Sequence, residues 1–233
     1  MEHFTRNYSD QDFGLVTPKI SVCIPAWKDA AGPLLSSLKD MPSSLPYEVI
    51  IYDDGSADPE LTSEIETSLQ MIKAPATLIT AKTNHGRSHA RNRLIHHASA
   101  QWILLLDADM LPDAQDFLEN YCQHIEADPT PTLIGGGFSL KQVTASTNQL
   151  LHAAQSKRSE CLSAAERSEN PGLHVFTSNI LVHREILDKV SFDEAYVGWG
   201  WEDVDWGIRV ARQYSVRHID NTCLLYTSPS PRD

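Results

Sequence analysis

Two aspartates follow the most apolar run of the chain, and their spacing could bind a divalent cation. Asp107 and Asp109 come directly after "WILLL" (Trp102–Leu106). Two unpaired carboxylates there would repel one another and resist burial, whereas Mg²⁺ or Mn²⁺ prefers carboxylates together with phosphate oxygens. The alternative is a turn closed by an aspartate side chain. The position directly after a buried strand favours the metal site.

A second acidic pair lies earlier in the chain. Asp53 and Asp54 are followed by Gly55 and Ser56. One interpretation is a turn with glycine in a left-handed conformation, followed by a helix cap. The other is a carboxylate that accepts hydrogen bonds from a ribose or a base, with glycine allowing a close approach. The motif by itself leaves the two interpretations equally open.

The stretch "TNHGRSHARN" (Thr83–Asn92) supplies positive charge. Arg87 and Arg91 lie one helical turn apart near a predicted helix start, where phosphate and other anions bind well. His85 and His89 have the same spacing, which could indicate a zinc pair. Arginines interleave them and no third nitrogen or sulfur ligand is evident, so a solvated helix face is the favoured interpretation for the histidines.

Acids and tryptophans occur together in "VGWGWEDVDWGIRV" (Val197–Val210). Glu202, Asp203 and Asp205 fall in the first turn of a predicted helix, where the helix dipole favours negative charge. Asp205 is predicted to pair with Arg209, four residues on. The core face of this helix is expected at Val204, Ile208 and Ala211, adjoined by Trp206 and Val210, with Trp206 serving mainly in packing.

The elements that would position these residues alternate between apolar strands and helices. Strands are expected at Lys19–Pro25, Tyr47–Asp54, Ala76–Lys82, Gln101–Met110, Thr132–Leu140, His174–His183 and Tyr214–Asp220. Helices are expected at Asp29–Asp40, from an Asp58 cap onward, at Gly86–Ala98, after Pro112 to about Ile125, at Ala145–Glu169 and at Arg184–Val190. This alternation predicts an α/β fold with a mostly parallel sheet flanked by helices. Ligands bind outside the carboxyl ends of such strands, where the acids lie.

Composition and charge narrow the class of protein. The formal net charge of -12 over 233 residues argues against a nucleic-acid binder and is compatible with a metal site. No apolar run is long enough for a membrane span, and the N-terminus lacks the apolar core of a signal peptide. The cysteines are widely spaced with no CxxC pair, which favours reduced thiols in a cytoplasmic protein: Cys23, Cys122, Cys161 and Cys223.

In order and spacing, these pieces resemble the GT-A-fold glycosyltransferases, specifically the inverting enzymes of family 2. The matching motifs are "ISVCIPAWKD", "VIIYDDGSAD", "TNHGRSHARN", "WILLLDADM" and "FTSNILVHREILDKVSFDEAYVGWGWEDVDWGIRV". The last segment is also similar to the C-terminal part of galactosyl- and N-acetylgalactosaminyl-transferases, which carry a WGxED pattern. The resemblance implies a Rossmann-like single domain that binds a nucleotide-sugar donor, here a UDP-sugar.

The resemblance also implies roles for individual residues. Asp53 and Asp54 would contact the uridine, and Pro25 and Ala26 would line the same pocket. Arg91 would lie near the donor.

Asp107 and Asp109 match the family's DxD motif. Asp107 would contact the donor as well as the metal, and Asp109 would be the more direct ligand of Mn²⁺ or Mg²⁺ bridging to the diphosphate. The family often adds a histidine ligand further on. Here the candidate is His218, which fits better as an ordinary strand residue.

On the acceptor side, Asp203 matches the general base and Glu202 would hold a sugar. Trp199 and Trp201 would form a sugar platform, since aromatic faces stack on sugar rings. An inverting transfer needs such a base and a cation at the leaving diphosphate. It needs no covalent intermediate, and the sequence contains no GxSxG or GxxxxGK[ST] motif. Gly135–Gly137 is interpreted as a strand passing close to another backbone or the donor.

The expected organisation is an N-terminal extension (1–18), a nucleotide-sugar half (19–140), an acceptor and catalytic half (141–223) and a tail (224–233). The tail, "LLYTSPSPRD", follows no pattern of the rest and is expected to be non-native or truncated and to lie outside the fold. The expected partners are the donor and a carbohydrate or other hydroxyl acceptor. The alternatives are a non-catalytic nucleotide- or sugar-binding module of a larger enzyme and, less favoured, a sugar nucleotidyltransferase.

Overall fold

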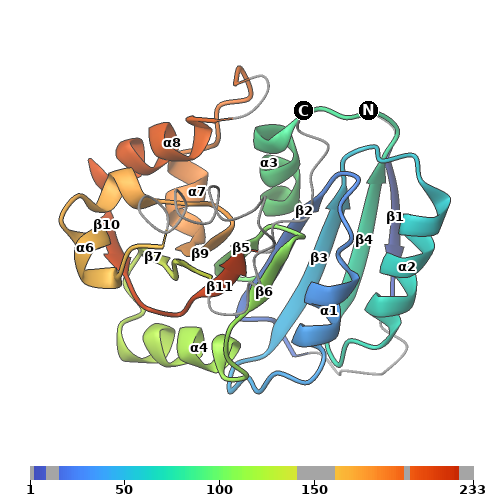
Figure 1. The fold of residues 1–233 in the computed structure, drawn as a ribbon, viewed down its shortest axis with the longest axis horizontal. Helices are drawn as coiled ribbons and strands as arrows, with labels where there is room; N and C mark the ends of the chain where they lie inside the picture. The colour runs from blue at the N-terminus through green and yellow to red at the C-terminus, as the bar shows by residue number, and fades with distance from the viewer. Residues whose placement is uncertain (1–2, 9–15, 141–160, 197–199, 226–233) are drawn as a thin grey trace, which may run out of the picture.

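The computed structural model describes residues 3–8, 16–140, 161–196 and 200–225. Its centre is an eight-stranded sheet with the order β1-β4-β3-β2-β5-β9-β7-β10 (Figure 1). These strands are β1 (His3–Asn7), β2 (Ile20–Ala26), β3 (Tyr47–Asp53), β4 (Ala76–Ala81), β5 (Trp102–Leu106), β7 (Thr132–Gly135), β9 (Asn179–His183) and β10 (Ser215–His218). A second sheet of three strands joins β6 (Met110–Pro112), β11 (Cys223–Leu225) and β8 (Phe138–Ser139).

The middle of the large sheet is parallel. Strands β4, β3, β2 and β5 pair in parallel, and β7 pairs in parallel with β10. Strand β9 is antiparallel to both β5 and β7, and β1 is antiparallel to β4. The prediction of a mostly parallel α/β sheet is therefore confirmed.

Helices cover both faces of this sheet. One core contains apolar residues of α1 (Gly32–Leu38), α2 (Pro59–Gln70) and α4 (Phe117–Ala127), and the other contains those of α3 (Arg87–His97), α7 (Arg184–Lys189) and α8 (Glu202–Ala211). The short helices α6 (Ala164–Ser168) and η1 (Pro171–His174) precede β9. Along β2, Val22 and Ile24 enter the first core and Cys23 the second, which is why the strand is apolar at successive positions.

The strand expected over Thr132–Leu140 is wrong, because the chain changes sheet at the glycines. Strand β7 ends at Gly135, and β8 belongs to the second sheet. A Cβ on Gly136 would lie 2.4 Å from the Tyr121 hydroxyl and 2.5 Å from Asn179 Nδ2. It would also lie 2.6 Å from the backbone carbonyl of Asn221, so the prediction that the strand passes close to another backbone is confirmed, and the crowding explains why the strand cannot continue as a single regular run.

Other boundaries also differ from the expectations. Helix α1 starts at Gly32 rather than Asp29, with a proline in its first turn. Residues after Asp109 form β6 before α4 begins. Only the second half of His174–His183 is a strand, because η1 ends at His174 and a loop with a turn follows it up to residue 178.

Both ends of the described chain contribute strands that were not expected. Strand β1 lies within the predicted N-terminal extension and pairs with β4. Leu224 and Leu225, expected outside the fold, lie in β11 and pair with β6. None of the helices in the described ranges has the length and apolar character needed to cross a membrane.

Candidate active site

The carboxyl ends of β2 and β3 bring the predicted donor-side residues together. Ala26 pairs with Asp53 across the two strands, next to Pro25, and the Asp54 N–H donates to the Ala26 carbonyl at 2.9 Å. Strand β5 pairs with β2 on its other side, so Asp107, which follows β5, lies at the same edge of the sheet. Residues far apart in the sequence thus meet where a parallel sheet offers a ligand site.

Asp53 and Asp54 are both buried and hold the loops around them. Asp53 Oδ1 accepts from the Ser56 N–H at 2.9 Å. The Asp54 carboxylate accepts from the backbone N–H groups of His85 and Gly86 at 2.8–3.0 Å, which fixes the start of α3 against the end of β3. Burial raises the pKa of the Asp54 carboxyl, and the two N–H donors oppose that effect.

Gly55 between these loops has a φ of 78°, the left-handed conformation that the turn interpretation required. The turn is present, and it leaves the second interpretation, contact with a nucleotide, open.

Arg91 connects the sheet edge to α8. Its guanidinium is 1% exposed, and Nη2 donates to Asp107 Oδ1 at 3.1 Å. Nη1 lies 3.5 Å from Asp203 Oδ1 and 3.8 Å from Glu202 Oε1. Burial by itself would lower the pKa of Arg91, but the three carboxylates outweigh burial and raise it. One buried cation therefore gathers acids from the end of β5 and the start of α8.

Asp203 and Glu202 are held from several sides. Asp203 Oδ2 accepts from the Thr177 N–H at 3.1 Å, and its side chain remains 21% exposed. Burial raises the pKa of the Asp203 carboxyl, Glu202 and Asp107 raise it further, and Arg91 opposes them. Glu202 is buried, with Oε2 accepting from the Gly200 N–H at 3.0 Å and Oε1 lying 3.5 Å from Arg87.

The tryptophans of this segment separate by environment. Trp201 precedes α8 with a φ of 67° and is 77% exposed, so its ring is available to a ligand. Trp199 lies outside the described residues. Trp206 is fully buried, donates to the Val190 carbonyl at 2.7 Å and stacks on Phe192, which confirms its packing role.

The remaining predictions for α8 have mixed outcomes. Asp205 and Arg209 pair at 2.8 Å, as predicted. The predicted core face is wrong: Val204 and Ile208 are half-buried and Ala211 is exposed, whereas Trp206 and Val210 are fully buried. The helix is turned so that its tryptophan packs into the core, because the wide ring buries more apolar surface than the aliphatic side chains would.

Sequence comparison identifies the family to which this chain belongs. The family model described as glycosyl transferase family 2 matches residues 21–191, most of the chain. The chain belongs to glycosyl transferase family 2. The match includes the strand ends with Asp54, Arg91 and Asp107 and stops before Glu202 and Asp203. No curated protein matches the chain significantly in sequence.

Solved glycosyltransferase structures share the GT-A fold of this family 2 chain. The mannosyltransferase PcManGT from Pyrobaculum calidifontis, in complex with GDP-Man and Mn²⁺, has a TM-score of 0.63 and 20% identity, covering 93% of this chain and 59% of that one. Residues 1–349 of TarS from S. aureus give a TM-score of 0.62 and 17% identity, covering 90% and 58%. The same TarS fragment in complex with UDP gives a TM-score of 0.58. The chain thus spans less than two thirds of the length of these proteins.

The DxD residues of this family 2 chain can supply part of a metal site. Asp107 is oriented by Arg91, and Asp109 follows in the turn before β6. Among the described residues no group of three or more His, Cys, Asp or Glu side chains could hold a metal ion. Mg²⁺ and related ions commonly take one or two carboxylates together with substrate phosphates and water, so the two aspartates fit an ion that arrives with a nucleotide diphosphate.

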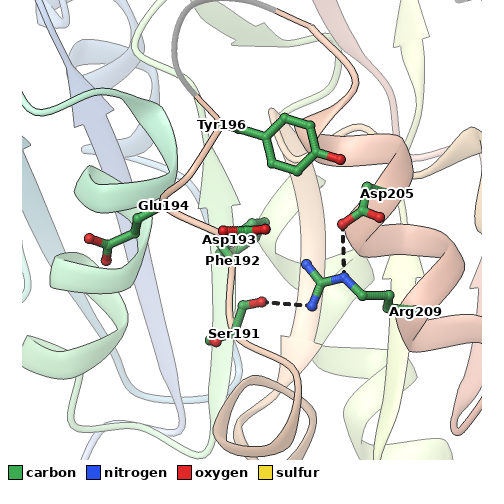
Figure 2. A pocket seen from close by; sticks show the side chains of 7 residues that line it. All are labelled: Ser191, Phe192, Asp193, Glu194, Tyr196, Asp205 and Arg209. Atoms are coloured by element: carbon green, nitrogen blue, oxygen red, sulfur yellow. Dashed lines mark hydrogen bonds and ion pairs between the residues drawn. The ribbon is translucent and has the colours of Figure 1, made fainter.

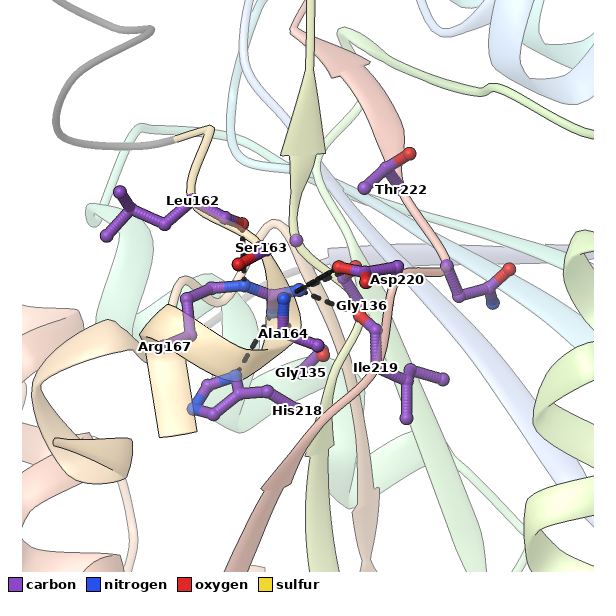
Figure 3. Close-up of polar contacts among 12 residues, drawn as sticks. Gly135, Gly136, Leu162, Ser163, Ala164, Arg167, His218, Ile219, Asp220 and Thr222 are labelled. Carbon is purple, nitrogen blue, oxygen red and sulfur yellow. Dashed lines mark hydrogen bonds and ion pairs between the residues drawn. The ribbon is translucent and has the colours of Figure 1, made fainter. Parts of the chain in front are cut away.

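His218 is committed to structural contacts. Its Nδ1 lies 3.1 Å from Arg167 Nη1, and its Nε2 lies 3.0 Å from the Pro171 carbonyl. Figure 3 shows Arg167 among the backbone carbonyls that it contacts, those of Leu162, Gly135, Gly136 and Ile219. These contacts support the interpretation of His218 as a strand residue.

Arg167 is itself buried, which sequence reasoning missed, because nothing in the sequence around a lone arginine in a polar helix indicates that it is buried.

Sequence reasoning also missed a polar cluster on α3. The solvated-face interpretation is wrong for His89, which is 7% exposed with Nδ1 3.0 Å from Glu194 Oε2. Asn92 donates to Glu194 at 2.8 Å and to the Phe192 carbonyl at 3.0 Å, and it accepts from the Phe192 N–H at 3.2 Å. The partners lie about a hundred residues on, so no local spacing could have predicted these contacts.

Proposed function

We propose that this chain transfers a sugar from a nucleotide diphosphate sugar to a hydroxyl acceptor by direct displacement with inversion. The observation that carries the proposal is Arg91, which contacts Asp107 on the donor side and Asp203 on α8 through one buried guanidinium. Donor-side and acceptor-side carboxylates are thereby close together at the ligand-binding edge of the sheet. We expect a hexosyl- or N-acetylhexosaminyl-transferase of polysaccharide biosynthesis, acting in the cytoplasm.

The donor half is residues 19–140 in this proposal. Pro25, Ala26, Asp53 and Asp54 would line the nucleotide pocket, with the N–H donors of the neighbouring loops keeping the aspartates in place. We propose UDP as the nucleotide. One structural neighbour was solved with UDP and another with GDP-Man and Mn²⁺, so both nucleotides belong in the test.

Asp107 and Asp109 would hold Mn²⁺ or Mg²⁺ together with the diphosphate. When bound, the ion would stabilise negative charge on the leaving group. Arg91 lies beside Asp107 and adds positive charge at the same place without becoming exposed to water.

Asp203 is the proposed base of the acceptor half, residues 141–223. The acceptor hydroxyl gives its proton to the Asp203 carboxylate as its oxygen bonds to the anomeric carbon. The bond from that carbon to the diphosphate breaks, and the electron pair leaves with the diphosphate. A pKa raised by burial suits a base that must take a proton near neutral pH. Glu202 would hold a sugar, and Trp199 and Trp201 would stack on it.

A donor screen tests the proposal. The chain is incubated with UDP-sugars and GDP-mannose, with Mn²⁺, Mg²⁺ or EDTA, and release of UDP or GDP is measured. We expect metal-dependent release from at least one UDP-sugar.

Asp203→Asn should lower turnover by roughly 100-fold or more, as loss of a general base does, while the Kd for UDP changes little. Asp188→Asn, an exposed aspartate on α7, is the matched control and should keep wild-type turnover.

Two outcomes count against the proposal. Full turnover in Asp203→Asn would remove Asp203 from the role of base. Calorimetric binding of UDP without turnover of any donor, even with simple glycosides as acceptors, would favour a non-catalytic binding module.

A further inference from the structure

A pocket of about 430 Å³ lies beside α8, and none of its lining residues is among those proposed to bind the donor, the metal or the reacting hydroxyl. Its walls are the segment 191–196 and the side chains of Asp205 and Arg209 (Figure 2). No lining residue belongs to β2, β3 or β5, whose ends form the donor side. The volume lies within the range of small-molecule sites and would accommodate one or two sugar rings.

Arg209 lines the pocket and is fixed by hydrogen bonds. Its Nε donates to Asp205 Oδ2 at 2.8 Å and its Nη1 to the Ser191 carbonyl at 3.0 Å. Nη2 is buried, has no hydrogen-bond partner within the described ranges, and points toward Asp193 in Figure 2. Because this nitrogen is buried, a ligand in the pocket would meet the exposed groups beside it, and Arg209 serves to hold Asp205 and the segment at Ser191 in place.

The other groups of the pocket accept hydrogen bonds or offer an aromatic face. Asp193 is exposed, and one of its oxygens accepts from the Ala195 N–H at 2.9 Å, leaving the other oxygen available. Tyr196 is 39% exposed and lies above Asp205 in Figure 2. A sugar presents hydroxyls that donate and accept, together with a C–H face that packs on an aromatic ring, so it matches all of these groups.

The net charge of the pocket favours neutral and amine-bearing sugars over anionic ones. Asp205 and Arg209 neutralise one another, and Glu194 is held by His89 and Asn92. Within the described ranges no cation pairs with Asp193, so the pocket carries net negative charge. A phosphate or uronate would meet that charge with too few donors, whereas a neutral or amine-bearing sugar would not be repelled.

We infer that this pocket is an acceptor subsite for a neutral or amino sugar. The inference rests on the proposed function, because a sugar bound here is an acceptor only if the chain transfers a group to it. Placement on α8 is consistent with it, since the same helix begins with Glu202 and Asp203. The ring of Tyr196 packs against the sugar face, and Asp193 accepts from its hydroxyl or ammonium groups.

Saturation-transfer NMR tests the subsite without any donor. The probes are methyl β-glucoside, methyl β-glucosaminide and methyl β-glucuronide, each titrated into the full chain. We expect binding of the first two and none of the glucuronide. Tyr196→Ala should weaken binding about two- to tenfold, while Tyr196→Phe keeps most of it, because the ring supplies the contact. Asp193→Asn should lower the preference for the glucosaminide and allow the glucuronide to bind.

Asp188→Asn is the matched control and should show the wild-type result with each probe: binding of the glucoside and the glucosaminide and none of the glucuronide. The subsite is refuted if no glycoside binds, if the glucuronide binds as well as the glucoside, or if Tyr196→Ala leaves binding unchanged. These outcomes are separate from the donor screen: turnover without glycoside binding refutes the subsite alone, and glycoside binding without turnover of any donor refutes the proposed function.

Discussion

Arg91 is the residue on which the charge balance of the site depends. It is fully buried and contacts Asp107, Asp203 and Glu202, of which Glu202 also has Arg87 nearby at 3.5 Å. A buried ion pair is costly to form and still more costly to leave half-made, since the remaining charges lose both water and partner. Removal of the cation should therefore affect stability more than removal of any single acid.

Arg91→Met keeps much of the side-chain volume and removes the charge. We expect the free energy of unfolding to fall by about 3–5 kcal/mol, the usual cost of breaking a buried pair. Urea unfolding followed by circular dichroism measures it. Arg6→Met removes an exposed arginine paired with Glu66 and should change the free energy of unfolding far less, because a solvent-exposed ion pair contributes little. Equal losses in the two variants would contradict the role assigned to Arg91.

Asp203 should make folding stability depend on pH. Its folded-state pKa is raised, so the native state holds this proton to higher pH than the unfolded chain does. The contribution of Asp203 to stability is therefore greatest below the unfolded pKa and is lost as pH rises through the folded pKa.

Asp203→Asn removes the free-energy cost of keeping a charged carboxylate buried above the folded-state pKa of Asp203. We expect its Tm at pH 7 to equal or exceed that of the wild type, with each 1 kcal/mol raising Tm by about 2–4 °C in a chain of this size. Below the unfolded pKa of Asp203 the advantage should disappear. Calorimetry across the pH range measures both, and a lower Tm for Asp203→Asn at pH 7 would show that the Arg91 contact outweighs burial.

At the scale of elements, adjacent residues of α3 contact two different regions: the acids of the candidate site and the segment that precedes α8. Arg91 contacts the acids of the site, and Asn92 binds the backbone of Phe192, which stacks on Trp206 of α8 with ring centroids 4.5 Å apart. The ring of Phe192 also lies 5.9 Å from the Arg91 guanidinium. The segment before α8 is therefore held against α3, and α8 is positioned through it.

Asn92→Ala removes these hydrogen bonds and leaves the Phe192 backbone groups unpaired. We expect a loss of about 1–3 kcal/mol in unfolding free energy and a lower turnover with an unchanged Kd for UDP, because α8 rather than the donor pocket is loosened. Chemical unfolding and donor hydrolysis measure these effects. His96→Ala, at an exposed position of the same helix, should leave both at wild-type values.

At the scale of the whole molecule, the chain crosses between its two sheets at Gly136. Tyr121 of α4, Asn179 of β9 and the Asn221 carbonyl all lie where a side chain at this position would be. Tyr121 donates to Asn179 at 2.8 Å, and Asn179 donates to the carbonyls of Gly137 and Asn221 at 2.9 Å. The crossing thus connects the large sheet, the small sheet and α4.

Gly136→Ala should disturb this crossing. Its Cβ would meet three atoms within 2.6 Å, all of them in a buried hydrogen-bond network, so we expect a cost of about 3 kcal/mol or more. Gly86→Ala is an informative comparison, because a Cβ there meets nothing within 4 Å and only its φ of 93° resists substitution. We expect a loss of about 1–3 kcal/mol from backbone strain alone, because φ 93° with ψ 168° lies in a region open almost only to glycine. Thermal unfolding of both variants measures the difference.

The sequence by itself determined the alternation of strands and helices and the placement of acids at strand ends. These properties follow from local patterns: apolar runs buried on both faces, the Asp58 cap of α2, and aspartates directly after β3 and β5. The i,i+4 pair of Asp205 and Arg209 is equally local and was predicted. The resemblance of its motifs placed the chain in the family that the comparison established.

Only the tertiary structure decided which distant residues meet. The contact of Arg91 with Asp203 joins positions 112 residues apart, and that of Asn92 with Glu194 joins positions 102 apart. The tertiary structure also set which face of α8 is buried, the burial of His89, and the change of sheet at Gly136. The physical reason is the same in each case: burial and close approach depend on what the rest of the chain packs against a residue, and sequence periodicity reports only which side of its own element that residue occupies.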